Sequence, residues 1–249
     1  MMRRVFLLAA LMLVIGLGTA HADTKKVIKV ASDCNWPPME FLSDDKKPMG
    51  FTTDLLAAMG EELGVKFEQS NIAWDGIFSS VAAGKFDMVA SSVTITEERK
   101  KIYLFSDPQY SVVQAVVMPK GKEIKSLADL KGKKVGGQIG TTGIFVIEKA
   151  KVGADVKEYE DVGLAMEELK NGRIDAVICD DNVATYYANV KKGFENTMHV
   201  AFKTQDTEEL AFLFNKKDTE LCALVNEGLK KVKASGKYDA LVKKWMGGN

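Results

Sequence analysis

The sequence Ser-Ser-Val-Thr-Ile-Thr-Glu-Glu-Arg, residues 91–99, predicts the fold and the site of this protein better than any other stretch. It continues an apolar run from Met88, and small hydroxyl residues alternate along it before a single arginine. We expect a strand over Met88–Ser92, so hydroxyls and free backbone N–H groups would lie at a strand end beside the guanidinium. A guanidinium matches two carboxylate oxygens in bidentate geometry and keeps its charge. The stretch therefore predicts a carboxylate pocket.

The same residues also have a purely structural interpretation. Thr96 would cap a short helix, and Arg99 would pair with a glutamate on the surface of that helix. The rest of the sequence is needed to choose between the carboxylate pocket and this structural interpretation.

Short apolar runs alternate with amphipathic stretches along the chain, which favours parallel strands covered by helices. In a first unit we expect strands at Val27–Ala31, Val65–Gln69 and Met88–Ser92, and helices at Thr53–Leu63 and Trp74–Ala83. In a second unit we expect strands at Ser111–Met118, Lys134–Gln138, Val156–Tyr159, Ala176–Cys179 and His199–Lys203, and helices at Ser126–Leu130, Gly143–Lys151, Val162–Lys170 and Asn182–Val190. Strand Leu210–Asn215 and helices Thr219–Ser235 and Tyr238–Trp245 then return to the first unit.

The second unit is thus inserted in the first, and no linker rich in proline or serine separates them. We expect two connecting strands to act as a hinge between two lobes, with the two sheets facing each other across a cleft. Ligands of open α/β sheets bind beyond the carboxyl ends of the strands. The predicted domains are a signal peptide at 1–22, lobe 1 at 23–111 plus 206–249, and lobe 2 at 112–205.

The N-terminus is typical of export. Two arginines, a short apolar core and Ala20-His21-Ala22 describe a secretory signal peptide cut after Ala22. Cleavage would remove Arg3 and Arg4 from a chain with 34 basic and 34 acidic residues, leaving two more acids than bases. A basic stripe for nucleic acid or an anionic membrane is not evident. No second long apolar segment follows, so we expect a periplasmic protein that is not embedded in a membrane.

Three cysteines, Cys34, Cys179 and Cys222, would remain after cleavage. An odd number leaves at least one free thiol or an intermolecular pair. Their spacing fits no metal site, and we predict no metal and no cofactor. Buried free thiols are the main expectation, and Cys34–Cys179 is the pair that would merit a test.

Further candidate residues follow other predicted strands. Asp33 and Trp36 come after the first strand, and Trp74 begins a helix. An aromatic ring there would pack on the aliphatic stem of a ligand or stack on a cation. Alternatively, Trp36 belongs to the core, and Asp75 caps the helix that begins at Trp74.

The second unit offers two more segments. The turn Gly140-Thr141-Thr142-Gly143 opens a helix and presents N–H groups and hydroxyls to an anion. Asp180 ends a strand and would accept bonds from an ammonium group. Alternatively, it caps the following helix, a role that suits Asp181 better. A cation in one lobe and an anion in the other predict a site for a free amino-acid zwitterion.

Several motifs in order carry a family resemblance. They are Asn35-Trp36-Pro37-Pro38-Met39-Glu40-Phe41, Gly50-Phe51-Thr52-Thr53-Asp54-Leu55, Trp74-Asp75-Gly76-Ile77, residues 91–99, Phe105-Ser106-Asp107-Pro108, Leu127-Ala128-Asp129-Leu130-Lys131-Gly132-Lys133, residues 140–143 and Gly172-Arg173-Ile174-Asp175-Ala176-Val177. Over nearly all of residues 27–245 the chain resembles the polar amino-acid-binding proteins of ABC importers, solute-binding protein family 3. The histidine-binding and lysine/arginine/ornithine-binding proteins of this family serve as models.

The resemblance implies an α/β, two-lobed periplasmic-binding-protein-like (type II) fold, with a mainly parallel sheet in each lobe and two hinge strands. It implies that Arg99, helped by Ser92, Thr94 and Thr142, holds the ligand carboxylate. It also implies that Asp180 holds the α-ammonium, with Ser92 and Thr94 nearby. Asp33 would face the ligand side chain. The full set of predicted ligand-binding residues is Asp33, Trp36, Trp74, Ser91, Ser92, Thr94, Arg99, Thr141, Thr142 and Asp180. The chain departs from the histidine-binding pattern at Gly143, where a polar side chain is expected, and at the bulky Trp74.

We therefore expect a binding protein and no catalytic residue. It would capture a free amino acid and deliver it to an inner-membrane ABC permease, as a monomer. Asp33, the two tryptophans and a second acid, Asp181, favour a basic or amide side chain. The alternatives are a cyclohexadienyl or arogenate dehydratase-like enzyme on the same fold and a sensor that feeds a signalling receptor. For an enzyme, Glu40 or Cys34 would have to serve as the acid, because His199 is expected to be structural, with no partner evident.

Overall fold

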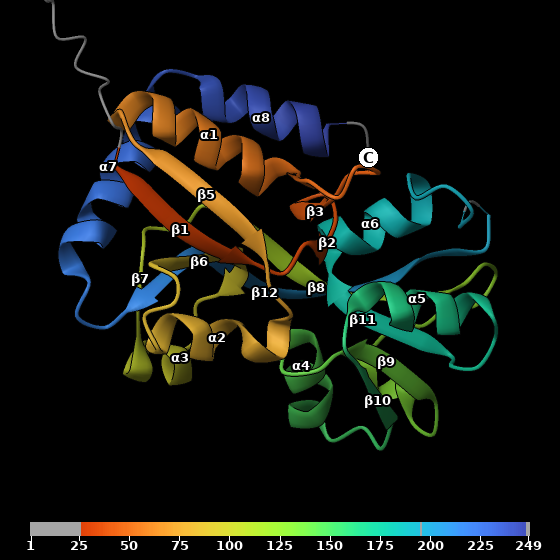
Figure 1. Ribbon diagram of the computed structural model, residues 1–249. Coiled ribbons are helices and arrows are strands. Elements are labelled where there is room, and N and C mark those ends of the chain that lie inside the picture. The colour runs from red at the N-terminus through yellow and green to blue at the C-terminus, as the bar shows by residue number, and fades with distance from the viewer. Residues whose placement is uncertain (1–25, 195, 248–249) are drawn as a thin grey trace, which may run out of the picture.

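The computed structural model describes residues 26–194 and 196–247 (Figure 1). The expected signal peptide, residues 1–22, lies outside them. Within the described ranges, no helix has both the length and the apolar character needed to cross a membrane.

Nine strands form one hydrogen-bonded sheet in the order β10-β9-β11-β8-β12-β6-β1-β5, and β7 pairs with β12 outside this path. The strands are β1 Val27–Ser32, β5 Lys66–Asn71, β6 Met88–Thr94, β7 Tyr103–Phe105, β8 Tyr110–Pro119, β9 Lys134–Gln138, β10 Asp155–Tyr159, β11 Ala176–Asp180 and β12 Met198–Asn215. The groups β5-β1-β6 and β11-β9-β10 are parallel, and the long strands β8 and β12 run antiparallel between them.

Helices flank both parallel groups (Figure 1). They are α1 Phe51–Leu63, α2 Trp74–Ala82, α3 Glu97–Ile102, the 3-10 helix η1 Leu127–Leu130, α4 Thr142–Ala150, α5 Val162–Lys170, α6 Asp181–Asn189, α7 Thr219–Ala234 and α8 Lys237–Met246. The buried strands carry the apolar β-branched runs that such sheets require, and β6 and β11 are buried along their whole length. The expected two-lobed α/β fold with flanking helices is confirmed.

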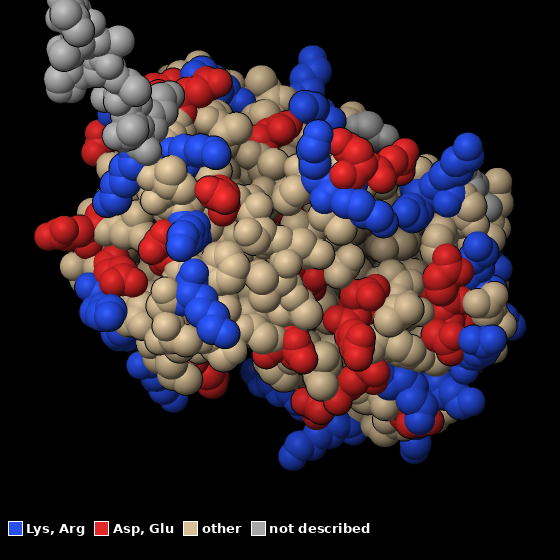
Figure 2. Space-filling view, viewed as in Figure 1, with Lys and Arg blue, Asp and Glu red and all other residues tan. Residues whose placement is uncertain are grey.

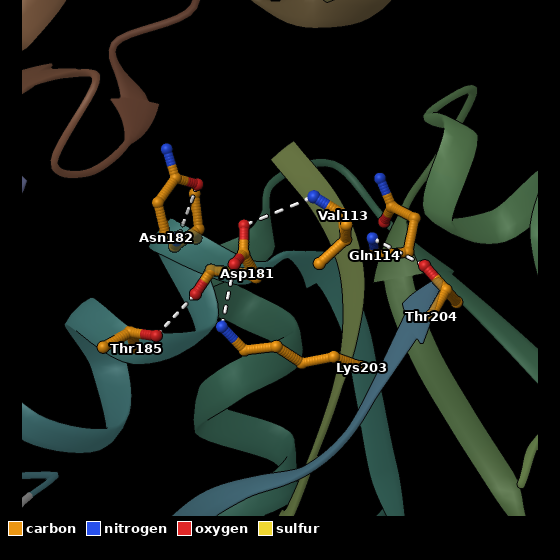
Figure 3. Close-up of polar contacts among 8 residues, drawn as sticks. Val113, Gln114, Asp181, Asn182, Thr185, Lys203 and Thr204 are labelled. Carbon is orange, nitrogen blue, oxygen red and sulfur yellow. Dashed lines mark hydrogen bonds and ion pairs between the residues drawn. The ribbon is translucent and has the colours of Figure 1, made fainter. Parts of the chain in front are cut away.

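We expected two separate sheets, but the strands form one continuous sheet. We expected two strands at His199–Lys203 and Leu210–Asn215, but β12 runs without interruption through both. The polar stretch between them contains a bulge: Lys203 pairs with Ala115, yet Thr207 pairs with Val113. The Thr204 hydroxyl accepts the Gln114 backbone N–H there at 3.1 Å (Figure 3). The two expected sheets are therefore joined through β8 and β12.

Three short strands escaped sequence analysis. They are β2 Asn35–Trp36, β3 Glu40–Leu42 and β4 Pro48–Met49, which form a small antiparallel sheet. The strand β7 was also missed, because it is too short to show a period. The six-residue helix α3 was expected only in the structural interpretation of Thr96 and Arg99. The predicted lobe boundaries fall inside β8 and inside the bulge of β12, and they stay a prediction.

Candidate ligand-binding site

A cavity lies between the carboxyl ends of strands from the two parallel groups, and its empty space, including the part open to solvent, is about 330 Å³. All ten residues predicted from the sequence line it, together with Gln138: Asp33, Trp36, Trp74, Ser91, Ser92, Thr94, Arg99, Gln138, Thr141, Thr142 and Asp180. The structure thus brings together residues that lie up to 147 positions apart in the chain, from Asp33 to Asp180.

Arg99 supplies the cation of the site. Its guanidinium donates to the Thr94 carbonyl at 2.9 Å and to the Gly140 carbonyl at 3.1 Å. It also lies 5.7 Å from the ring centroid of Trp74 and 5.3 Å from that of Phe78, which is cation–π distance. Burial lowers the pKa of Arg99 to about 10, so it remains charged at neutral pH.

The helix that carries Arg99 begins as the structural interpretation expected. The Thr96 hydroxyl accepts the Arg99 backbone N–H at 3.1 Å and caps α3. The rest of that interpretation is wrong, because Arg99 turns into the cavity while Glu97 pairs with Lys100 at 2.9 Å. The short helix α3 is therefore capped by Thr96, and it also places Arg99 in the cavity.

Asp180 supplies a carboxylate on the other side of the cavity. Its Oδ2 accepts the Trp36 indole N–H at 2.9 Å, and its Oδ1 accepts the Gln114 amide at 2.8 Å. Burial is the main cause that raises the pKa of Asp180 to about 7, and these hydrogen bonds oppose it. Asp180 holds the N-cap position of α6 but makes no side-chain capping bond. Its side chain faces the cavity instead.

Asp181 is not the second acid of the cleft that we expected. Its carboxylate pairs with Lys203 at 2.8 Å and accepts the Val113 backbone N–H at 3.4 Å (Figure 3). These partners belong to the hinge strands β12 and β8, and Asp181 does not line the cavity. It begins α6, where consecutive side chains diverge by about 100° around the axis. Asp180 therefore faces the cavity, whereas Asp181 binds the hinge strands.

Asp33 lies at the other end of the cavity. Its Oδ2 accepts the Gln138 amide at 2.7 Å, and its Oδ1 accepts the Asn35 amide at 2.9 Å. Burial raises the pKa of Asp33 to about 6, which these two hydrogen bonds oppose and Asp161 and Asp75 reinforce. The backbone N–H of Asp33 donates to Ser91 Oγ at 2.9 Å, which ties β1 to β6.

Three polar residues at or beside the cavity were missed from the sequence. Gln138 ends β9 and lines the cavity, and its strand-end position was the available signal. Gln114 on β8 and Glu208 on β12 lie behind the lining, where Glu208 Oε2 accepts from the Gln114 amide at 3.3 Å. Both lie in the hinge strands, which we had treated as connections.

The groups considered for an enzyme lie elsewhere. Glu40 and Cys34 are buried behind the lining, and burial raises the pKa of Cys34 to about 12. His199 does have a partner, contrary to expectation, because its Nε2 lies 3.0 Å from Glu123 Oε1. None of these three lines the cavity. The cysteines Cys34, Cys179 and Cys222 are buried free thiols, so Cys34 and Cys179 are not paired.

The fold and the cavity between two groups of strands define a two-lobed solute-binding protein. The chain belongs to the bacterial extracellular solute-binding proteins, family 3, whose sequence model matches residues 28–248. This agrees with the resemblance found in the sequence motifs.

Named relatives and solved structures are similar over most of the chain. A probable histidine-binding protein of Neisseria gonorrhoeae is 36% identical over 231 residues, covering 90% of this chain and 85% of its own. The L-cystine-binding protein TcyJ of Escherichia coli K12 is 34% identical, covering 88% and 82%. The arginine-, lysine-, histidine-binding protein ArtJ of Geobacillus stearothermophilus is 39% identical with a TM-score of 0.83, covering 89% and 96%. These relatives are named as binding proteins, and the chain is a binding protein rather than an enzyme.

Proposed function

We propose that this chain captures a free polar amino acid, with a basic or amide side chain, between two lobes and delivers it to an ABC importer. The observation that carries the proposal is that the cation of Arg99 and the carboxylate of Asp180 line the same cavity. A zwitterion presents a carboxylate and an ammonium that match these groups in charge. Arg99 holds the carboxylate in a bidentate contact, and Asp180 accepts the α-ammonium.

The electrostatic surroundings support a basic side chain. Among the described residues that line the cavity, Arg99 is the one cation, whereas Asp33 and Asp180 are acids. Figure 2 shows further acidic side chains over the region where α4 and α5 lie. Asp75 and Asp161 are close enough to raise the pKa of Asp33. Such a field attracts cations, and relatives named for histidine and for arginine, lysine and histidine fit this preference.

The contacts across the cavity support a clamp that closes. Trp36 donates to Asp180, and Gln138 donates to Asp33, so predicted lobe 1 touches predicted lobe 2 directly. A ligand would form hydrogen bonds with the polar groups of these side chains and replace some of the direct contacts between the lobes. A ligand shifts such an equilibrium only by its extra affinity for the closed form, and the closed form would dock on the permease.

The proposal places the protein in the periplasm as a monomer. The apolar N-terminal segment would be removed after Ala22, which mass spectrometry of the exported protein tests directly. An intact residue 1 on the exported chain contradicts the cleavage. Light scattering tests the monomer.

A thermal-shift screen of the ligand-stripped protein tests the function. L-arginine, L-lysine, L-histidine or L-glutamine should raise the melting temperature, since a ligand of the native state stabilises it by mass action. Arg99→Ala should abolish the shift, while Arg173→Ala should keep it, because Arg173 is exposed and pairs with Glu168. Silence toward all free amino acids contradicts the proposal, and a shift with L-glutamate alone contradicts the basic or amide preference.

A further inference from the structure

One oxygen of Glu208 accepts hydrogen bonds from three side chains at one end of the cavity. Oε2 accepts from Thr142 Oγ1 at 2.6 Å, from Thr94 Oγ1 at 3.0 Å and from Gln114 Nε2 at 3.3 Å. These donors come from α4, β6 and β8, and Glu208 itself comes from β12. The two hydroxyls line the cavity, while Glu208 lies behind them.

The number of protons on the two threonine hydroxyls determines which hydrogen bonds they can make with a ligand. A threonine hydroxyl has one proton and two lone pairs, and a carboxylate has no proton to give. Thr94 and Thr142 therefore donate their hydroxyl protons to Glu208. Thr94 Oγ1 and Thr142 Oγ1 also lie 3.3 Å apart, but neither has a second proton to donate to the other. Toward the cavity both oxygens act only as acceptors.

The neighbouring groups have the same polarity. The Gln114 amide, which donates to Glu208 and lies 3.3 Å from Thr142 Oγ1, also donates to Asp180 Oδ1 at 2.8 Å. This links the two threonine oxygens to the Asp180 carboxylate, so acceptors gather at this end of the cavity. A ligand group that contacts these oxygens must bring protons, because they offer it only lone pairs.

We propose that Glu208 is a positioning residue that turns Thr94 and Thr142 into acceptors, so that this end of the cavity recognises an ammonium and rejects an oxygen. The inference rests on the proposed function and specifies it: the ligand must be an α-amino acid and not its 2-oxo acid. It assigns the hydroxyls of Thr94 and Thr142 to the ammonium. The family resemblance placed Thr94 near the ammonium as well as at the carboxylate, and it made Thr142 only a helper of Arg99 at the carboxylate. Glu208 acts through the hydroxyls without touching the ligand.

The test compares amino acids with their 2-oxo acids, in which a carbonyl oxygen replaces the α-ammonium. Dissociation constants of L-arginine, L-histidine and their 2-oxo analogues are measured by calorimetry at pH 8. The variants are Glu208→Leu, which removes the acceptor, and Glu208→Gln, which keeps an acceptor oxygen but loses the charge. Glu209→Gln is the matched control, because Glu209 is the next residue of β12 and accepts from the Ser111 hydroxyl instead.

The readout is the preference for the amino acid over the 2-oxo acid, which a merely structural role would not move. In Glu208→Leu the freed hydroxyls can donate, so we expect this preference to fall at least about tenfold, the size of one charge-assisted hydrogen bond. Glu208→Gln should lower it by less, and Glu209→Gln should keep it.

An unchanged preference in folded Glu208→Leu overturns the inference. If circular dichroism shows that this variant does not fold, Glu208→Gln decides: a lowered preference supports the inference, and the wild-type preference overturns it. Failure of the proposed function looks different, because the wild-type protein would then bind no amino acid at all. In that case both proposals are withdrawn.

Discussion

At the scale of single residues, the site could be predicted because its chemistry is concentrated at strand ends. The ten predicted residues line one cavity, since Asp33, Arg99 and Asp180 each follow or end an apolar run that marks a strand. Glu208 could not be found in this way. It lies in the polar stretch between two expected strands, and only the pairing of β12 with β8 brings it to the cavity.

Asp33 should set the preference for the ligand side chain. Asp33→Asn removes a buried charge while keeping the size of the group, so binding of L-arginine should weaken by about 1.5–3 kcal/mol, the worth of a hydrogen bond to a charged group. Binding of L-alanine should change little. Calorimetric titration measures both, with the exposed Asp44→Asn as control. Equal losses for the two ligands would contradict the role of Asp33.

Asp180 should make binding depend on pH near neutrality. Its pKa is raised to about 7, mainly by burial, and an ammonium favours the ionised form. Binding must therefore release a proton below pH 7, and the affinity for L-arginine should fall by about tenfold per pH unit below that point. Between pH 7 and pH 8 the affinity should level off, because Asp180 is then mostly ionised and the guanidinium of the ligand does not titrate there.

Titrations between pH 5 and pH 8 measure this dependence. Asp180→Asn should bind more weakly and lose the part of the pH dependence that Asp180 causes. The same slope in Asp180→Asn as in the wild-type protein would assign the dependence to another group, with Asp33, whose pKa is about 6, as the first to examine.

At the scale of elements, α4 packs against the hinge at a glycine. A Cβ added at Gly143 would lie 2.8 Å from Gln114 Oε1 and 3.3 Å from the Ile178 carbonyl. The glycine that departs from the histidine-binding pattern is thus explained by the close approach of Gln114, whose amide must reach Asp180 and Glu208. No periodic pattern contains this information, because it arises from contact between distant segments.

Gly143→Ala should therefore weaken both the fold and the site. Overpacking costs about 1–3 kcal/mol of unfolding free energy, and a displaced Gln114 would also lower ligand affinity. Urea denaturation and calorimetry measure the two effects. Gly76→Ala in α2 is the matched control, since nothing lies within 4 Å of its added Cβ, and it should be neutral or gain about 0.4–1 kcal/mol. A loss of stability in Gly76→Ala comparable to that in Gly143→Ala would contradict the packing argument.

At the scale of the whole molecule, the alternation of strands and helices predicted the fold class and the insertion of one unit in the other. It did not predict that β8 and β12 join both units into one sheet. The reason is the bulge in β12, where polar residues interrupt the apolar pattern without ending the strand. The small sheet β2-β3-β4, which positions Trp36, was also too short to be seen.

The arrangement of the molecule places Arg99 and Asp180 in different predicted lobes, so a ligand that closes the clamp must carry both a carboxylate and an ammonium. The most direct measurement is a calorimetric comparison of L-arginine with agmatine, which lacks only the carboxylate. We expect L-arginine to bind with a dissociation constant of about 1 μM, and agmatine to bind at least about a hundredfold more weakly, because the buried Arg99 loses its bidentate partner. Equal affinity for the two ligands, or binding of neither by a protein that also ignores L-histidine and L-glutamine, would contradict the amino-acid clamp.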